Sequence, residues 1–315
     1  MGRRFISPFI KKTIFVLGWS FLALHVVFAQ VNRRYAFSLQ TDNDSYLMTG
    51  QDQYYTNGLV MTFDKLLQQE AYKGDLLRLQ LGHQLFNGSE VYGREDIKWD
   101  RPSTGRFFLN GQFQRTYASE WLWAVKAEAG AMGGAGGGKE IQRFIHKLFH
   151  MYEVESWESN LRSSLGLDLE GGLLKKLWRN HADRFEISGG AMGRVGMNFS
   201  HLSGQVYFRA GKLAPYRQSH FTGNGGFFSD AAEYYFFYSP GYMYQFYDAT
   251  IEGALFARRK DERYHISSHV LTQRVGFAYS RAQFSIEGSF LFNTREGKEM
   301  LGNHQYARIQ AGLRF

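Results

Sequence analysis

A polar stretch near the N-terminus, residues 41–58, contains the first side chains that could take part in chemistry. Its sequence is TDNDSYLMTGQDQYYTNG, with Asn43 and Asp44 near its start and Thr56 near its end. Carboxylate and amide oxygens bind hard cations, so these residues could hold one. Asn, Asp, Ser and Gly also favour turns, because their side chains bond the local backbone. A surface loop is therefore the simpler interpretation, and the residue types alone leave both open.

The segment KEIQRFIHKLFH, residues 139–150, is the clearest helix in the sequence. Its apolar stripe consists of Ile141, Phe144, Ile145 and Leu148. Gln142 and His146 are four residues apart and share a helix face beside that stripe. Imidazole is a general base near neutral pH, so His146 could activate water, although a histidine in this position is also commonly a packed or solvated side chain. His146 and His150 have the spacing of a metal pair, but no HExxH motif, cysteine or adjacent carboxylate pattern supports a zinc site.

Residues 1–29 have the features of a secretory signal peptide. Four basic residues, Arg3, Arg4, Lys11 and Lys12, precede the apolar run TIFVLGWSFLALHVVF, which ends before Ala29. The small residue predicts cleavage there and leaves residues 30–315 as one exported domain. The run is long enough that a retained membrane helix is the alternative.

Charge and cysteine content narrow the function further. The chain has 37 Lys and Arg residues against 29 Asp and Glu, but four of the basic residues lie in the signal segment. The remaining excess is too small to indicate a nucleic-acid partner. An exported chain without cysteine forms no disulfides, so its stability must come from a core or from a membrane.

Apolar and polar residues alternate along most of the exported part, which is the period of a β-strand with one apolar face. Tyr35, Phe37 and Leu39 show this alternation, and residues 77–82 repeat it. Roughly twelve such segments occur. Long strands with a polar second face predict an all-β fold, a transmembrane antiparallel β-barrel in a Gram-negative outer membrane, with the helix in an outer loop. The terminal Phe315 resembles the last-strand signature of such barrels; a secreted soluble β-protein is the alternative.

The order of the strands predicts on which side of the membrane each connection lies. With the N-terminus inside, connections after odd-numbered strands are on the outer side. The first and third strands, expected to end near Gln40 and Leu85, and the fifth strand then place three long insertions at the outer rim, namely residues 41–58, 87–104 and 129–158. The second strand, expected to end near Leu66, leads into a periplasmic turn. Loops on a rigid scaffold commonly carry functional sites. The same count gives a long periplasmic connection around residues 212–239, which is unusual and raises the alternative that the strand count is wrong there.

Four signatures together make the chain resemble the LpxR-type lipid A 3'-O-deacylases of Gram-negative outer membranes. They are Asn43-Asp44 ending the first strand, Tyr55-Thr56-Asn57-Gly58 entering the second, Asp100-Arg101-Pro102 opening the fourth, and GGGKEIQRFIH with Trp157 downstream. Their order and spacing are specific in combination. The resemblance covers the N-terminal half closely and the C-terminal half mainly as a barrel pattern.

The resemblance implies a twelve-stranded barrel with a calcium-dependent site at the outer-leaflet rim, which hydrolyses an ester that attaches an acyl chain to lipid A. Carried over by position, His146 would be the general base that activates water. Asn43, Asp44 and Thr56 would surround it, and Gln142 would lie one helical turn before it. The expected partners are lipopolysaccharide and the surrounding outer-membrane lipids, and the expected state is a monomer.

The resemblance also implies calcium ligands and phosphate ligands. The calcium ligands would be Asn43, Asp44 and an acidic residue after the helix, for which Glu153 and Glu155 both fit. The phosphate ligands would be Arg94, Lys98 and Arg101. Guanidinium groups suit phosphate, but solvated loop charges explain these three residues equally well. The chain departs from the family where Ser103-Thr104-Gly105 replace a Tyr-Ala-Gly step.

Two other functions fit an outer-membrane barrel. A phospholipase would use a serine nucleophile with histidine and asparagine, and the sequence has no His-x-Ser-Asn-Gly stretch to support it. A non-enzymatic barrel, either a pore or a structural anchor, would need neither Asp44 nor His146. The four ordered motifs favour a calcium-dependent lipid A esterase over both.

Overall fold

The computed structural model describes residues 33–47, 54–92, 98–149, 157, 161–256 and 263–315, without the side chains of residues 69, 145, 146, 148 and 149. The predicted signal peptide, residues 1–29, lies outside this set.

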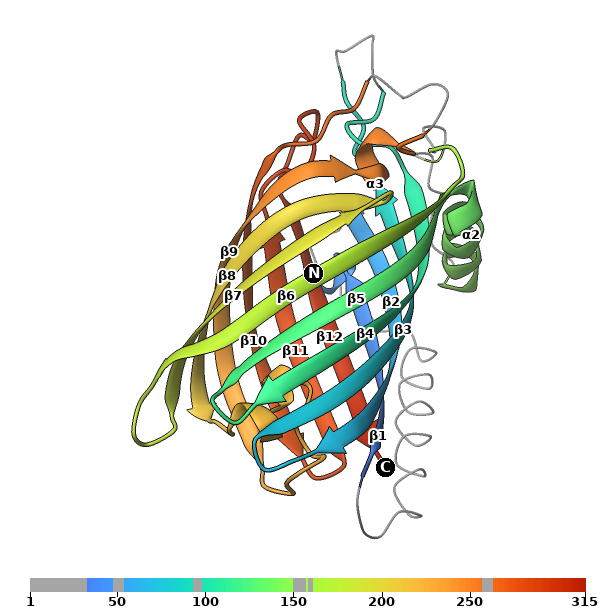
Figure 1. Cartoon of the computed structure of the whole chain (residues 1–315). Coiled ribbons are helices and arrows are strands. Elements are labelled where there is room, and N and C mark those ends of the chain that lie inside the picture. Colours follow the sequence, from blue (N-terminus) through green and yellow to red (C-terminus); the bar gives the residue numbers. More distant parts are fainter. Residues whose placement is uncertain (1–32, 48–53, 93–97, 150–156, 158–160, 257–262) are drawn as a thin grey trace, which may run out of the picture.

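Twelve antiparallel strands in the described ranges close into one barrel (Figure 1). Each strand pairs with its neighbours in the sequence, and β1 closes the barrel by pairing with β12. The strands are β1 (Tyr35–Asn43), β2 (Tyr54–Gln69), β3 (Lys73–Asn87), β4 (Thr104–Tyr117), β5 (Trp121–Gly133), β6 (Ser164–Arg179), β7 (Phe185–Gly196), β8 (Phe199–Lys212), β9 (Glu233–Asp248), β10 (His269–Arg281), β11 (Phe284–Asn293) and β12 (His304–Arg314). The predicted all-β barrel of about twelve strands is confirmed.

The alternation in the sequence separates an apolar outer wall from a polar lumen. Leu39 pairs with Met61, Met61 with Leu81, and Leu81 with Leu109, so one apolar row crosses four neighbouring strands. The intervening residues point inward, where Arg78 Nε lies 2.7 Å from Asp64 Oδ1 across two strands. Apolar side chains outside and paired charges inside are the arrangement that a lipid-exposed barrel requires.

Two helices lie in connections at the outer rim, the end of the barrel where β1 leads into β2. Helix α2 (Gly138–Phe149) follows β5, and α3 (Ala249–Glu252) follows β9. In Figure 1, α2 stands outside the barrel wall beside β3 and β4, whereas α3 lies over the barrel rim. The predicted helix in an outer loop is therefore confirmed. No helix among the described residues is long and apolar enough to cross a bilayer.

The strands run slightly further toward the rims than the alternation suggested. The first three end at Asn43, Gln69 and Asn87. Backbone pairing between strands extends past the alternating segments into polar residues. Asn43, for example, still pairs with Asn57 in β2 and with Ala307 in β12.

The long periplasmic connection expected around residues 212–239 is real, and the strand count there is correct. The connection covers residues 213–232, because β9 already begins at Glu233. It contains two short 3-10 helices, η5 (Tyr216–Gln218) and η6 (His220–Thr222). The connection folds back into the barrel, which accounts for its length.

Candidate active site

A β-bulge shapes the start of β2. The pairing of β2 with β3 shifts register between Tyr55 and Asn57, so Thr56 is an extra residue. A bulge of this kind reverses the side-to-side alternation of a strand. As a result the Tyr55 hydroxyl points into the lumen and donates to Asp42 Oδ2 at 2.9 Å. Asn57 instead continues the outward row of Leu59, which is 44% exposed.

Gly58 provides the room that this arrangement needs. A Cβ at Gly58 would lie 1.8 Å from the Tyr55 hydroxyl oxygen. The Tyr55 ring cannot move aside easily, because it is buried between Phe86 and Tyr306. The tetrapeptide from Tyr55 to Gly58 therefore works as one unit: the glycine admits the tyrosine ring, and the ring fixes the bulge.

Oxygen-bearing side chains of the predicted site gather at this bulge. Asp44 and Thr56 are buried, with 2% and 4% of their surface exposed. Thr56 Oγ1 has no hydrogen-bond partner among the described residues. Asn43 Oδ1 accepts from the Ser45 backbone N–H at 2.7 Å, which turns the chain back toward the rim directly after β1.

Helix α2 brings Gln142 to the end of β3. Gln142 Oε1 accepts hydrogen bonds from Asn87 Nδ2 at 3.1 Å and from Trp157 Nε1 at 2.6 Å. Asn87 is the last residue of β3 and pairs with Tyr54, next to the bulge. The bond from Asn87 therefore connects α2 with the strand that borders Thr56, and the bond from Trp157 holds the Gln142 side chain from the chain segment after the helix.

Glycines allow α2 to lie directly on the outer wall. A Cβ at Gly105 in β4 would lie 2.4 Å from the backbone nitrogen of Gly138 and 2.9 Å from the carbonyl oxygen of Gly136. His83 of β3 adds a hydrogen bond from Nε2 to the Gly136 carbonyl at 2.8 Å. Gly105 belongs to the same outward row as Phe107, so the helix rests on the lipid-facing side of the barrel.

The predicted catalytic residues thus fall into two groups. Asn43, Asp44, Thr56 and Gln142 belong to adjoining elements at one part of the outer rim. His146 lies in α2, one turn beyond Gln142, but its side chain is outside the described part of the structure. Glu153 and Arg94, predicted for calcium and phosphate, are also outside the described residues.

Of the predicted phosphate ligands, Lys98 is exposed, whereas Arg101 is buried with 1% exposure. Arg101 Nη2 donates to Thr250 Oγ1 at 2.6 Å, and Nη1 lies 3.5 Å from Glu296 Oε2. These contacts join the β3–β4, β9–β10 and β11–β12 connections. The geometry therefore favours a loop-joining role for Arg101 over a phosphate contact at the membrane surface.

The same network continues from Glu296 to the bulge. Glu296 Oε1 lies 3.3 Å from His304 Nδ1, and His304 Nε2 accepts the Tyr55 backbone N–H at 3.1 Å. Because Nε2 accepts, the ring proton is on Nδ1 and faces Glu296. Burial opposes ionisation of Glu296, but His304 and Arg101 lower its pKa to about 2, so it stays a carboxylate.

Asp100 organises the neighbouring backbone. Its Oδ2 accepts from the Tyr54 hydroxyl at 2.7 Å and from the Leu301 N–H at 2.9 Å, and its Oδ1 accepts from the Ser89 N–H at 2.6 Å. Burial is the largest influence on Asp100 and raises its pKa. Sequence reasoning included Asp100 in a signature without giving it a role.

Sequence reasoning missed the supporting residues Asn87, Tyr54, Glu296 and His304. Asn87 carries a weak signal, because it ends an alternating segment and precedes a glycine. His304 carries none, since its partner Tyr55 is 249 positions away.

The oxygen donors at the bulge fit a hard cation. Carboxylate, amide and hydroxyl oxygens are available from Asp44, Asn43 and Thr56, and a buried hydroxyl without a protein partner is a ready ligand. In the described part of the chain, no group of three or more His, Cys, Asp or Glu residues could hold a metal. A site here would thus need amide, hydroxyl or carbonyl oxygens, which suits calcium better than zinc.

Comparisons with known proteins give one matching family model and one solved structure with the same fold. The model of the family described as outer membrane protein LpxR matches residues 15–315. LpxR from Salmonella typhimurium superimposes with a TM-score of 0.72 at 15% identity, over 89% of this chain and all of that one. The translocator domain of autotransporter NalP from Neisseria meningitidis gives a TM-score of 0.44 at 10% identity, over 97% of this chain and 96% of that one. No curated protein matches the sequence.

Proposed function

The chain belongs to the LpxR family of outer membrane proteins, and from this membership we propose that it is a calcium-dependent lipid A 3'-O-deacylase. The reaction would hydrolyse an ester-linked acyl chain of lipopolysaccharide in the outer leaflet. Lipid A and the surrounding outer-membrane lipids are the partners that this proposal requires, and one chain contains the whole candidate site.

The position of the polar site at the top of an apolar wall carries the proposal. Asn43 lies in the outward row above Leu39 and Phe37, which are 37% and 43% exposed. Asn57 lies above Leu59 in the next strand. An acyl chain lying along this wall would bring an ester at the headgroup level to the bulge. A site inside the lumen could not be reached from the lipid in this way.

His146 would be the general base, because an unperturbed imidazole accepts a proton near neutral pH. It would take a proton from water while the water oxygen bonds to the ester carbonyl carbon. The bond between that carbon and the sugar oxygen then breaks, and His146 returns the proton to the sugar oxygen. The products are a fatty acid and a free sugar hydroxyl.

The neighbouring residues would hold the reacting groups in place. Gln142, fixed by Asn87 and Trp157, sets the position of the helix turn that precedes His146. Asn43, Asp44 and Thr56 would hold calcium, with Glu153 as a further ligand. Bound calcium supplies positive charge for the oxyanion of the ester.

Mass spectrometry of lipid A tests the proposal. Outer membranes that contain the chain should lose an acyl or acyloxyacyl mass when calcium is present and keep it after chelation. His146→Ala should abolish the loss. His265→Ala is the matched control, because His265 is an exposed histidine in the outer β9–β10 connection, bonded to Glu299. Unchanged lipid A with a folded, inserted barrel would contradict the proposal.

A further inference from the structure

The connection between β8 and β9, residues 213–232, lies inside the periplasmic end of the barrel; we refer to it as the plug segment. Its contacts reach walls on opposite sides of the lumen. The Tyr216 hydroxyl donates to Ser188 Oγ in β7 at 2.6 Å, and Gln114 Nε2 of β4 donates to the Thr222 carbonyl at 2.7 Å. Phe227 packs against Leu66 of β2 and Leu76 of β3. Because β2–β4 and β7 all contact it, the segment spans the lumen.

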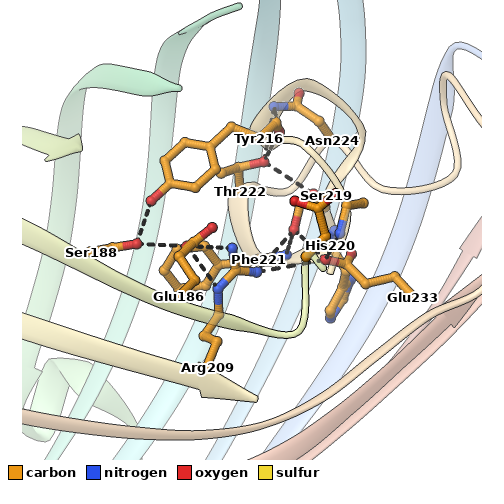
Figure 2. A network of polar contacts seen from close by, with 12 residues as sticks. Glu186, Ser188, Arg209, Tyr216, Ser219, His220, Phe221, Thr222, Asn224 and Glu233 are labelled. Atoms are coloured by element: carbon orange, nitrogen blue, oxygen red, sulfur yellow. Dashed lines mark hydrogen bonds and ion pairs between the residues drawn. The ribbon is translucent and has the colours of Figure 1, made fainter. Parts of the chain in front are cut away.

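One buried carboxylate holds the centre of the plug segment. Glu233, at the start of β9, accepts from the Ala214 N–H at 3.2 Å, from Ser219 Oγ at 2.7 Å and from the His220 N–H at 2.6 Å. Figure 2 shows Glu233 and Arg209 on either side of Ser219. Hydrogen bonds to a charged group are stronger than neutral ones. Glu233 therefore binds three donors of the plug segment at once.

Arg209 adds a second fixed point on the barrel wall. Its Nη1 donates to Ser219 Oγ at 3.2 Å, and its Nη2 lies 2.6 Å from Glu186 Oε1 in β7. The guanidinium carbon lies 4.0 Å from the centre of the Phe221 ring. Arg209 and Glu186 are both fully buried, so the plug segment packs on a charge pair that water does not reach.

The far end of the plug segment is also closed. Gly226 adopts a φ of +77°, and a Cβ there would lie 2.3 Å from the Ala282 carbonyl of the β10–β11 turn. Arg33 Nη1 donates to the Gly226 carbonyl at 3.0 Å. Asn224 Nδ2 donates to Thr116 Oγ1 of β4 at 3.0 Å. The segment is thus bonded to the wall along its whole length and not only at its two ends.

We propose that the plug segment is an internal seal that makes this barrel impermeable to ions. A wide barrel with a polar interior conducts water and ions unless something fills it. The plug segment fills this one at the periplasmic end with buried side chains whose polar groups are bonded to the walls. This role is separate from the proposed deacylation, because it concerns the lumen and not the lipid-facing rim.

Planar-bilayer recording of the full chain and its variants tests the seal. The unaltered chain should show no steady conductance. A chain in which residues 216–229 are replaced by a short Gly-Ser linker should conduct in discrete steps. Glu233→Gln should keep the barrel intact but raise the open fraction by roughly tenfold, because a charged acceptor of three hydrogen bonds is lost. Asp75→Asn is the matched control: Asp75 accepts two hydrogen bonds from Arg115 but lies outside the lumen.

A second measurement keeps the test decisive if the linker variant does not fold. The chain has no cysteine, so Ser188→Cys introduces a single thiol at the position that the Tyr216 hydroxyl contacts. A charged thiol reagent should leave it unmodified in the otherwise unaltered barrel and should label it when Glu233→Gln is added. Steady conductance of the unaltered chain would overturn the seal, and so would equal labelling of the thiol with and without Glu233→Gln.

Discussion

Thr56 combines the two properties that a metal-binding hydroxyl needs. It is buried, and its Oγ1 has no hydrogen-bond partner among the described residues. A buried hydroxyl without a partner normally costs stability. The bulge that creates this position is fixed from both sides, by the Tyr55 hydroxyl in the lumen and by His304 on its backbone. We interpret the unsatisfied hydroxyl as a cost that ion binding offsets.

Thr56→Val tests this interpretation, because it removes the hydroxyl and keeps the shape. The barrel should be as stable as before or slightly more stable, whereas the affinity for terbium, used as a luminescent substitute for calcium, should fall by roughly tenfold. Thr62→Val is the control: Thr62 Oγ1 accepts from Gln80 Nε2 in the lumen at 3.0 Å, so its loss should cost stability and leave terbium binding unchanged. Equal terbium affinity in Thr56→Val and the unaltered chain would exclude Thr56 as a ligand.

The resemblance to the LpxR-type family nominated Asn43, Asp44, Thr56 and Gln142 by position, but neither it nor the residue types indicated the residues that support them. The hydrogen bonds from Tyr54 to Asp100 and from Tyr55 to His304 form only when the twelve strands have closed into the barrel in register. Arg101 is the converse case, in which the sequence suggested a role that the fold does not favour. Its charge suggested phosphate, but folding buries it between Thr250 and Glu296, which lie far along the chain.

Helix α2 can pack closely on the barrel wall because the contact is made by glycines, which have no side chains. Its apolar stripe and its Gln142–His146 spacing were predictable from the sequence, but its docking depends on Gly105 in a different element. That contact brings two backbones together, with Gly136 and Gly138 opposite. The glycine-rich run before the helix is therefore explained by close packing on the wall as well as by turn formation.

Gly105→Ala should displace α2 without disturbing the barrel. Its Cβ would meet backbone atoms of Gly136 and Gly138, which cannot rotate away. The bond between Gln142 and Asn87 should weaken, and lipid A deacylation should fall by roughly a hundredfold, since small misplacements at a reacting centre are costly. Gly111→Ala, in the same outward row of β4, is the control, because its Cβ would meet only Leu79 at 3.6 Å. Equal activity of the two variants would contradict the docking argument.

The plug segment should respond to acid through His220. Burial, followed by Arg314, Arg78 and Arg274 around it, lowers the pKa of His220 to about 4, although Glu287 opposes this effect. Glu233, bonded to its backbone N–H, is the other charged group that it faces. Because the unfolded chain binds a proton more readily, stability should fall as the pH drops from about 6.5 to about 4, by at most roughly 3 kcal/mol. It should not fall further from this cause below pH 4.

Unfolding in denaturant at a series of pH values measures this effect. His220→Gln removes the titrating group and should flatten the dependence between pH 6.5 and 4. His181→Gln, at an exposed histidine in the β6–β7 turn, is the control and should leave the dependence as it was. If His220→Gln and the unaltered chain lose stability in parallel, the histidine is not the cause.

At the scale of the whole molecule, most of the fold could be predicted from the period-two alternation of apolar and polar residues. It predicted the apolar outer wall, the polar lumen, the strand number and the side of each connection, because each of these follows from which residues share a face. Alternation could not show that residues 213–232 turn back into the barrel. That outcome depends on Glu233, Arg209 and Ser219 meeting in the lumen, and such contacts leave no periodic pattern.

Strand parity puts the candidate site on the outer side of the membrane and the plug segment on the periplasmic side, and this orientation can be tested with single cysteines. Leu301→Cys lies in the outer β11–β12 connection, where Leu301 is 63% exposed. His181→Cys lies in the β6–β7 turn, where the histidine is also exposed. A membrane-impermeant thiol reagent should label Leu301→Cys on intact cells and His181→Cys only after the outer membrane is opened. The reverse pattern would place α2 and the bulge in the periplasm, where no lipid A of the outer leaflet could reach them, and the proposed reaction would fail with the orientation.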